Sequence, residues 1–408
     1  MRLEKAAEKL RLYGQEHILK YYDTLSETEK EELLRQIEQT DFSVISQITG
    51  EHIELKRGTI TPIQAMTLSE IQEHEKSFTD NGLEAIKAGK IAAVLLAGGM
   101  GTRLGSDDPK GMYDIGLTKP VYIFERLIRN LFDIVDQTGT WIHLFVMTSD
   151  KNHEATTSFF EKQNYFGYDP EYIHFFRQEM APAVTYDGKV YMESRNHIAT
   201  SPNGNGGWFA SMKNAGLLDL IHDSGIEWLN VFAVDNVLQR IADPCFIGAT
   251  LEKNCKVGAK VVRKADPDEK VGVMCLEDGR PSIVEYYEQT DQLRNTKTET
   301  GEPAYNFGVI LNYLFHEKSL EEICDTTLPL HLVEKKIPYI NEEGVFIKPE
   351  EPNGYKFESL ILDMIHLLDT CLPYEVVREK EFAPVKNKTG VDSVESARAL
   401  LEKNGYSL

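Results

Sequence analysis

Residues 91–111 read IAAVLLAGGMGTRLGSDDPKG, and this stretch decides the fold. It begins with a run of apolar residues, Ile91 to Leu96, that is typical of a strand buried on both faces of a sheet. The glycines that follow allow a sharp turn and a close approach of the backbone to a ligand. Arg103 and Lys110 add full positive charge to a loop whose main-chain N–H groups can point at an anion. The stretch therefore predicts a phosphate-binding loop at the end of a buried strand.

The chain beyond this stretch alternates apolar runs with helical patterns. Apolar runs at 141–150, 172–176 and 228–238 predict strands, and the pattern at 208–225 predicts one amphipathic helix that ends at a glycine. This alternation predicts an α/β fold with a mostly parallel central sheet flanked by helices. Ligands of such sheets bind beyond the carboxyl ends of the strands, where we expect both the phosphate-binding loop and the Asp235-Asn236 pair.

Bulk composition excludes several classes of protein. The 408 residues carry a net charge of −21, which argues against non-specific binding of nucleic acid. An acidic chain that binds phosphates must concentrate positive charge locally. No apolar stretch reaches the ~18 residues that a membrane span needs, and the first residues lack the apolar region of a signal peptide. The five scattered cysteines match no zinc spacing, so we expect reduced thiols and a cytoplasmic protein.

Two familiar glycine-rich loops do not fit the phosphate-binding loop. A P-loop needs a Gly-Lys pair followed by Ser or Thr, and the chain has none. A dinucleotide-binding loop needs a third glycine where Leu104 stands, and an acidic residue further on where Lys119 and Pro120 stand. An oxidoreductase is therefore a weak alternative.

A third kind of loop fits. The segments LLAGGMGTRLG (95–105) and DDPKGMYDIG (107–116) resemble the signature of the sugar-nucleotide pyrophosphorylases, and most closely that of the UDP-N-acetylhexosamine pyrophosphorylases. The resemblance covers about 91–390, with further similar segments in the same order. These segments are FRQEMAPAV (176–184), SPNGNGGWFAS (201–211), VFAVDNVLQRIADPCFIG (231–248), the Val-Glu-Tyr at 284–286, NFG (306–308) and REKEFAPVKN (378–387).

The resemblance implies a Rossmann-like nucleotide-diphospho-sugar transferase fold. On this basis we divide the chain into a helical N-terminal region at 1–90, a nucleotidyltransferase catalytic domain at 91–315, and a part at 316–408. The last part would complete the catalytic domain and add a small α+β region. Because the chain ends soon after Lys386, we expect the C-terminal β-domain of eukaryotic members to be absent or much reduced.

The implied activity is that of a uridylyltransferase, which forms a UDP-sugar and pyrophosphate from UTP and a sugar 1-phosphate. N-acetylglucosamine 1-phosphate is the first candidate; glucose 1-phosphate, galactose 1-phosphate, N-acetylgalactosamine 1-phosphate and a broad specificity remain open. A non-catalytic sensor of UDP-sugars is an alternative of another class, but it would not need Arg103, Lys110 and Asp235 together. The resemblance implies Mg²⁺ as cofactor and no obligate protein partner.

The resemblance also assigns residues. Arg103, Lys110 and Lys386 would be catalytic, and Asp235 would hold Mg²⁺, because an acidic residue beside phosphates is costly unless it binds a cation. Uracil would lie near Gln178 and Gly204, and the sugar near Asn205, Glu285 and Asn306. The full predicted substrate-binding set is Leu96, Ala97, Gly98, Gly99, Lys110, Gln178, Gly204, Asn205, Asp235, Glu285, Asn306 and Lys386.

Overall fold

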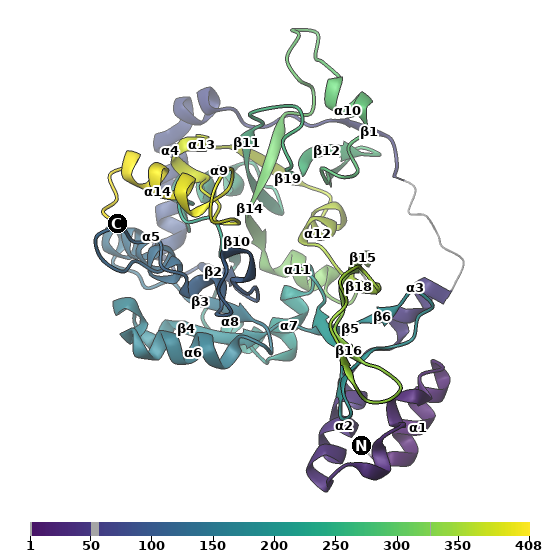
Figure 1. Ribbon diagram of the computed structural model, residues 1–408. Helices are drawn as coiled ribbons and strands as arrows, with labels where there is room; N and C mark the ends of the chain where they lie inside the picture. Colours follow the sequence, from purple (N-terminus) through teal and green to yellow (C-terminus); the bar gives the residue numbers. More distant parts are fainter. Residues whose placement is uncertain (1, 50–56, 327) are drawn as a thin grey trace. The chain divides into compact units, whose positions relative to one another are not determined.

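The computed structural model describes residues 2–49, 57–326 and 328–408 (Figure 1). The chain forms two compact units, each assembled from three separate segments. The first unit comprises Met1–Lys56, Glu179–Gly207 and Thr327–Ile361; the second comprises Arg57–Gln178, Trp208–Thr326 and Leu362–Leu408. The units thus alternate along the chain, whereas the sequence analysis divided it into consecutive parts. That division stays a prediction.

The second unit is built on a mixed sheet that has ten strands within the described residues. Its main path runs β1-β12-β14-β10-β2-β3-β4, and β11, β13 and β19 pair beside it. The strands are β1 (Ile60–Pro62), β2 (Ile91–Leu96), β3 (Leu144–Thr148), β4 (Ile173–Arg177), β10 (Trp228–Ala233), β11 (Val257–Arg263), β12 (Val273–Glu277), β13 (Arg280–Val284), β14 (Phe307–His316) and β19 (Cys371–Glu375).

Strand β2 lies inside this sheet, which explains its uninterrupted apolar sequence. All six of its residues are buried. Val94 pairs with Val231 of β10 on one side and with Phe145 of β3 on the other, in parallel in both cases. Strand β4 continues the parallel arrangement, and β14 runs antiparallel to β10. The predicted α/β class with a mostly parallel central sheet flanked by helices is confirmed.

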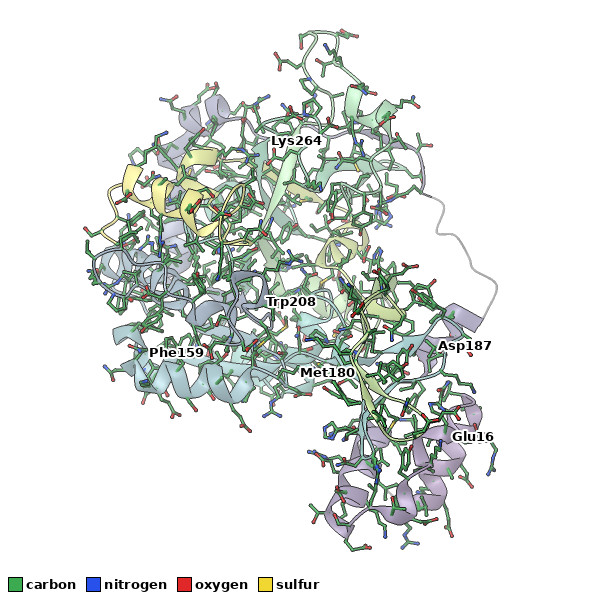
Figure 2. The ribbon with its side chains drawn as sticks, viewed as in Figure 1. Glu16, Phe159, Met180, Asp187, Trp208 and Lys264 are labelled. Carbon is green, nitrogen blue, oxygen red and sulfur yellow. The ribbon has the colours of Figure 1, made fainter. Side chains whose placement is uncertain are left out.

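Helices of the second unit cover this sheet. Apolar side chains of α4, α5, α6, α9 and α14 join those of the strands in one core. Trp208, labelled in Figure 2, is the first residue of α7 and is completely buried. The helices are α4 (Leu68–Lys87), α5 (Ile123–Thr138), α6 (His153–Lys162), α7 (Trp208–Asn214), α8 (Leu218–Asp223), α9 (Pro244–Glu252), α10 (Asp291–Asn295), α11 (Glu317–Ile323), α12 (Ile361–Leu367, which begins at the last residue of the first unit), α13 (Arg378–Glu381) and α14 (Val394–Lys403).

The single helix predicted at 208–225 is wrong. The segment forms two helices, α7 and α8, because Gly216 adopts a left-handed conformation with φ of +72°. A residue in this conformation ends a helix, and glycine adopts it without steric cost. None of the helices in the described part of the chain is long and apolar enough to cross a membrane.

The first unit has its own core, made by helices and short strands that are far apart in the sequence. Ala6 and Leu10 of α1 and Leu33 of α2 are buried together with Val184 and Phe357 of the strands. Helix α2 starts at a capping box, in which the Ser26 side chain accepts the N–H of Glu29 and the Glu29 side chain accepts the N–H of Ser26. The elements are α1 (Leu3–Leu12), α2 (Glu27–Gln39), α3 (Ser46–Thr49), β5 (Met180–Pro182), β6 (Val184–Thr185), β7 (Met192–Ser194), β8 (His197–Ile198), β9 (Thr200–Pro202), β15 (His331–Lys335), β16 (Tyr339–Ile340), β17 (Phe346–Ile347) and β18 (Gly354–Glu358).

Candidate active site

The phosphate-binding loop folds back on itself directly after β2. The N–H of Gly101 donates a hydrogen bond to the carbonyl oxygen of Asp108 at 2.8 Å, and the N–H of Lys110 donates one to the carbonyl oxygen of Gly99 at 3.1 Å. These bonds hold the two ends of the loop together. Arg103 and Lys110 therefore extend from one closed piece of backbone.

Asn152 ties this loop to the neighbouring strand, and the sequence analysis missed it. Its side chain is fully buried. Its Nδ2 donates to the carbonyl oxygen of Ala97 at 2.9 Å, and its Oδ1 accepts from the N–H of Ser149 at 2.8 Å. Ser149 directly follows β3, so the end of β3 positions the start of the loop. The polar run TSDKN at the end of a predicted strand was the available signal.

Gln178 and Gly98 lie in direct contact. Gln178 follows β4 and is almost completely buried. A Cβ atom built on Gly98 would lie 2.4 Å from Gln178 Nε2, which is closer than real contacts allow. Glycine at position 98 permits this approach, and a larger residue there would force the end of the Gln178 side chain to move. Leu96 and Ala97 are buried, whereas a Cβ built on Gly99 would meet nothing within 4 Å.

Lys110 lies in a cluster of charges with Arg103, Asp235 and Lys386, which we call the charged cluster. Burial lowers the pKa of Lys110; Asp235 acts in the opposite direction, and Arg103 and Lys386 lower the pKa further. These effects place Arg103, Asp235 and Lys386 near Lys110, since Coulomb interactions weaken with distance. Three positive charges and one negative charge give a local excess that a polyanion would neutralise.

Two of these cations lack a salt bridge to any residue that the structure describes. Among the residues that the structure describes, the side chains of Arg103 and Lys110 form no ion pair or hydrogen bond. Lys386 Nζ lies 3.1 Å from Asp392 Oδ2. In a chain with 65 acidic residues, two unpaired cations on one loop have an electrostatic reason to bind an anion.

Asp235 reaches the same edge of the sheet from the neighbouring strand. Strand β10 runs parallel to β2 and ends two residues before Asp235. The N–H of Val234 donates to the carbonyl oxygen of Leu96 at 3.3 Å, which keeps the two strand ends together. No residue in the described ranges donates a hydrogen bond to the Asp235 carboxylate. A free carboxylate beside a phosphate site fits Mg²⁺, which binds through one or two carboxylates together with phosphate oxygens.

Asn236 holds the C-terminal segment against this strand end. It is almost completely buried. Its Nδ2 donates to the carbonyl oxygen of Glu381 at 2.8 Å, and its Oδ1 accepts from the N–H of Ala383 at 2.9 Å. The segment that leads to Lys386 is thereby fixed beside Asp235. The sequence predicts the Asp235-Asn236 pair at this functional edge of the sheet, but it assigns a specific role to Asp235 alone.

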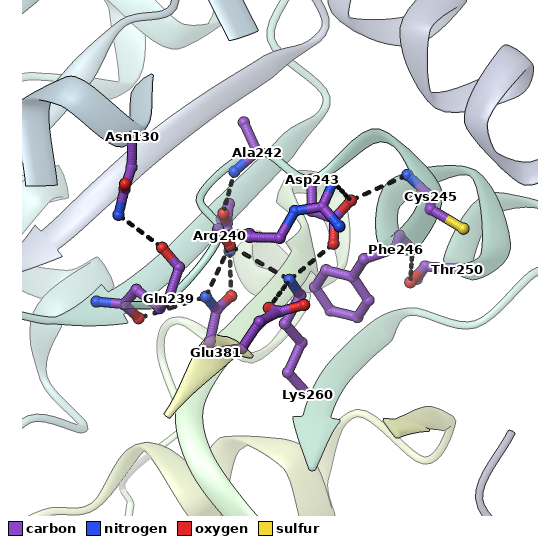
Figure 3. A network of polar contacts seen from close by, with 12 residues as sticks. Asn130, Gln239, Arg240, Ala242, Asp243, Cys245, Phe246, Thr250, Lys260 and Glu381 are labelled. Carbon is purple, nitrogen blue, oxygen red and sulfur yellow. Dashed lines mark hydrogen bonds and ion pairs between the residues drawn. The ribbon is translucent and has the colours of Figure 1, made fainter. Parts of the chain in front are cut away.

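A buried ion network supports the same segment (Figure 3). Lys260, on β11, is 0% exposed; its Nζ lies 2.8 Å from Asp243 Oδ2 and 2.6 Å from Glu381 Oε2. Arg240 Nη2 lies 3.2 Å from the other carboxylate oxygen of Asp243. Burial opposes ionisation of Asp243, but Lys260 and Arg240 hold its pKa below the ordinary value. A lysine inside the apolar run VGAKVV (257–262) was the signal for this network.

Glu285 and Asn306 lie next to antiparallel strands of the same sheet. Glu285 directly follows β13 and donates its N–H to Glu288 Oε2 at 3.0 Å. Asn306 directly precedes β14, is almost completely buried, and accepts the N–H of Lys264 on its Oδ1 at 3.1 Å. Their contact with a sugar stays a prediction.

Gly204 and Asn205 belong to the first unit, where they meet the segment at 359–361. A Cβ built on Gly204 would lie 2.1 Å from the carbonyl oxygen of Ser359, and the φ of Gly204 is +87°. Asn205 Oδ1 accepts the N–H of Ile361 at 2.9 Å. Both residues are therefore held in place within that unit, and their contacts with uracil and sugar stay predictions.

The fold and these residues define an α/β protein with an anion-binding loop at the carboxyl ends of parallel strands. Comparison with known proteins gives the family. Residues 39–407 match the family described as UTP–glucose-1-phosphate uridylyltransferase. The chain belongs to this family, which confirms the predicted enzyme class, a nucleotidyltransferase.

Individual relatives agree with this assignment. UDP-N-acetylhexosamine pyrophosphorylase-like protein 1 of Mus musculus is 34% identical over 406 residues, which span 93% of this chain and 79% of that protein. UDP-N-acetylglucosamine diphosphorylase 2 of Arabidopsis thaliana is 37% identical over an alignment of 420 residues, gaps included. The alignment covers 97% of this chain and 82% of that protein. The crystal structure of the UDP-N-acetylglucosamine pyrophosphorylase of Trypanosoma brucei, in complex with an inhibitor, is 29% identical; it has a TM-score of 0.82 and covers 98% of this chain and 84% of that one.

Proposed function

We propose that this enzyme forms UDP-N-acetylglucosamine and pyrophosphate from UTP and N-acetylglucosamine 1-phosphate. The charged cluster of Arg103, Lys110, Asp235 and Lys386, where β2 and β10 end, is the observation that carries the proposal. The names of the relatives in Arabidopsis thaliana and Trypanosoma brucei support this sugar over glucose.

The reaction needs positioning and charge neutralisation more than acid–base chemistry. A phosphate oxygen of the sugar 1-phosphate attacks the α-phosphorus of UTP in line. The bond from the α-phosphorus to the bridging oxygen breaks, and pyrophosphate leaves with the electron pair. A phosphate monoester is already deprotonated near neutral pH, so no general base is required. Catalysis then rests on cations that stabilise the charge in the transition state.

Each cation of the charged cluster has a place in this scheme. Arg103 stabilises the departing pyrophosphate, while Lys110 and Lys386 neutralise charge on the attacking and attacked phosphates. Burial and the other two cations lower the pKa of Lys110 in the free protein. Bound phosphates act in the opposite direction and favour the protonated ammonium.

Asp235 is the residue that would hold Mg²⁺. Its carboxylate supplies one hard oxygen ligand, and the triphosphate supplies others. When bound, the ion would add positive charge beside the phosphates. The protein itself contributes the placement of that carboxylate, which the parallel pairing of β10 with β2 fixes.

The uracil and the sugar have separate sets of residues. The side-chain amide of Gln178 both donates and accepts, which suits the polar edge of a pyrimidine, and it lies against Gly98 at the start of the phosphate-binding loop. The resemblance adds Gly204 for uracil, and Asn205, Glu285 and Asn306 for the sugar.

A panel of sugar 1-phosphates tests the proposal. Pyrophosphate release is measured with UTP, Mg²⁺ and, at equal concentration, the 1-phosphates of N-acetylglucosamine, N-acetylgalactosamine, glucose and galactose. We expect the highest rate with N-acetylglucosamine 1-phosphate and loss of the rate when Mg²⁺ is chelated. A preference for glucose 1-phosphate would overturn the choice of sugar. Binding of UDP-sugars without pyrophosphate release from any substrate would identify a sensor instead.

We also propose that the enzyme works in a reducing compartment such as the cytoplasm. Its five cysteines are free thiols. Burial raises the pKa of Cys275 to about 12 and also raises that of Cys245, so both thiols resist ionisation and oxidation. Fractionation of the cell of origin with an antibody to the protein checks this location.

A further inference from the structure

Lys388 brings another cation to the phosphate-binding loop. A Cβ atom built on Gly105 would lie 2.7 Å from Lys388 Nζ and 3.0 Å from its Cε, so the end of this side chain rests on Gly105. Gly105 ends the short 3-10 turn at Thr102–Leu104, which carries Arg103. Lys388 therefore lies on the part of the loop to which we assign the departing pyrophosphate.

The backbone that carries Lys388 is fixed. The N–H groups of Lys386 and Asn387 both donate to the carbonyl oxygen of Asp392, at 2.8 and 3.0 Å. The N–H of Val394, the first residue of α14, donates to the carbonyl oxygen of Asn387 at 2.9 Å. Lys388 directly follows this closed base, so its side chain reaches the loop from an anchored position.

Lys388 has no carboxylate partner among the described residues. Its side chain is exposed and forms no ion pair or hydrogen bond within the described part of the chain. It approaches the glycine of a loop that carries Arg103 and Lys110, in a chain with 65 acidic and 44 basic residues. Gathering like charges costs free energy that a bound polyanion offsets.

The position of Lys388 associates it with Arg103. Gly105, on which the Lys388 side chain rests, ends the turn that carries Arg103, whereas the N–H of Lys110 bonds to Gly99 at the start of the loop. We assigned Arg103 to the departing pyrophosphate, so Lys388 is placed for the phosphates at the far end of UTP.

We propose that Lys388 binds the terminal phosphates of UTP and the pyrophosphate that they become. The proposal rests on the proposed function. The ammonium acts as a point charge with three hydrogen-bond donors, which suits a phosphate that must be released after each turnover. Arg103 and Lys388 would then hold pyrophosphate from two separate segments of the chain.

The reverse reaction gives the sharpest test, because pyrophosphate is then a substrate with its own KM. UDP-N-acetylglucosamine and pyrophosphate are converted to UTP by the full chain and by the variants Lys388→Ala and Lys388→Arg. Lys380→Ala is the matched control, since Lys380 is an exposed lysine of the same C-terminal segment. We expect Lys388→Ala to raise the KM for pyrophosphate on the order of 10-fold, since a charge-assisted contact is lost at a partly screened site.

The other measurements separate binding from a structural role. The KM for UDP-N-acetylglucosamine should change less than that for pyrophosphate, Lys388→Arg should restore most of the affinity, and high salt should shrink the difference. An unchanged KM for pyrophosphate in Lys388→Ala would overturn the proposal. Equal increases in both KM values, with a lower melting temperature, would overturn it too, because they indicate that Lys388 only supports Gly105.

A binding measurement keeps this proposal distinct from the proposed function. If the unaltered enzyme turns over no sugar nucleotide in either direction, the proposed function fails. Titration calorimetry with pyrophosphate and Mg²⁺ then still compares the unaltered chain with Lys388→Ala. Weaker binding by the variant supports the role of Lys388, and equal binding refutes it.

Discussion

The main-chain N–H of Val385 donates a hydrogen bond to the main-chain carbonyl oxygen of Asp235, at 2.9 Å. This bond joins two positions that are 150 residues apart in the sequence. Lys386 is the next residue after Val385, so a backbone hydrogen bond determines how close the lysine comes to the proposed metal ligand. The charge pattern of the site depends on this junction as much as on the charged groups.

Replacement of Lys386 should affect turnover far more than stability. We expect Lys386→Ala to lower kcat on the order of 10²–10³-fold, since one charge that stabilises the transition state is removed. The Lys386 side chain is only half-buried and its ion pair with Asp392 is also partly exposed, so the fold should survive. Steady-state kinetics and thermal melting are compared with Lys380→Ala. Near-normal turnover would remove Lys386 from the mechanism.

Replacement of Asn236 should act through Lys386. Asn236→Ala loses both hydrogen bonds that fix the segment at 381–383. A displacement of a catalytic group by about 1 Å costs on the order of 10²-fold in rate, so we expect a large fall in kcat and a smaller change in the KM for UTP. Two buried groups also lose their partners, which should lower the unfolding free energy by about 1–3 kcal/mol. A stable variant with full kcat would show that other contacts hold the segment.

The buried ion network should be far more important for stability than a surface pair of the same kind. Lys260→Met leaves the carboxylates of Asp243 and Glu381 buried beside each other without their shared cation. Breaking a buried pair in this way typically costs about 3–5 kcal/mol. Lys76→Met is the matched control, because Lys76 pairs with Asp80 on the surface and is 89% exposed. Urea unfolding measures both; a similar small effect for the two variants would contradict the prediction.

His174 should make the protein less stable in acid. Burial, followed by the nearby His143, lowers the pKa of His174 from 6.5 to about 4. The two rings share a hydrogen bond at 2.9 Å. The unfolded chain therefore binds more protons than the folded one between about pH 6.5 and 4, and the unfolding free energy falls as pH falls through this window. In His174→Phe this fall should be smaller than in the unaltered protein.

His222 provides a control of opposite sign. A hydrogen bond with Glu317 raises the pKa of His222 in the folded protein. The contribution of His222 to the unfolding free energy is therefore fully present below the pKa of the unfolded chain, and it is lost as pH rises through the pKa of the folded protein. His222→Gln should therefore lower the unfolding free energy in acid. His174→Phe should instead reduce the loss of unfolding free energy that acid causes. Equal pH profiles for both variants would contradict these assignments.

The sequence was informative where a local pattern has one physical solution. Six apolar residues in a row before a glycine-rich loop predicted β2 and the phosphate-binding loop, because such a strand needs partners on both faces. Arg103 and Lys110 were found because no packing role explains two cations in that loop. The resemblance added Lys386, whose distance from Asp235 in the sequence hides their closeness in space.

Long-range contacts could not be predicted in this way. Lys260 was visible as a lysine in an apolar strand, but its partners Asp243 and Glu381 are identified only when β11 and α13 are placed. Asn236 forms hydrogen bonds with main-chain groups. Because almost every residue has these groups, nothing in the sequence indicates which of them are its partners. The break at Gly216 was missed because an amphipathic pattern continued across it.

The alternation of the two units along the chain has a consequence for synthesis. Phe42 shares its buried cluster with Phe357, which is translated about 300 residues later. At about 5–20 residues per second, the partner emerges on the order of 15–60 s after the N-terminal helices. During that time the apolar faces of α1 and α2 lack their final neighbours. We therefore expect these helices to need protection by chaperones at the ribosome during that time.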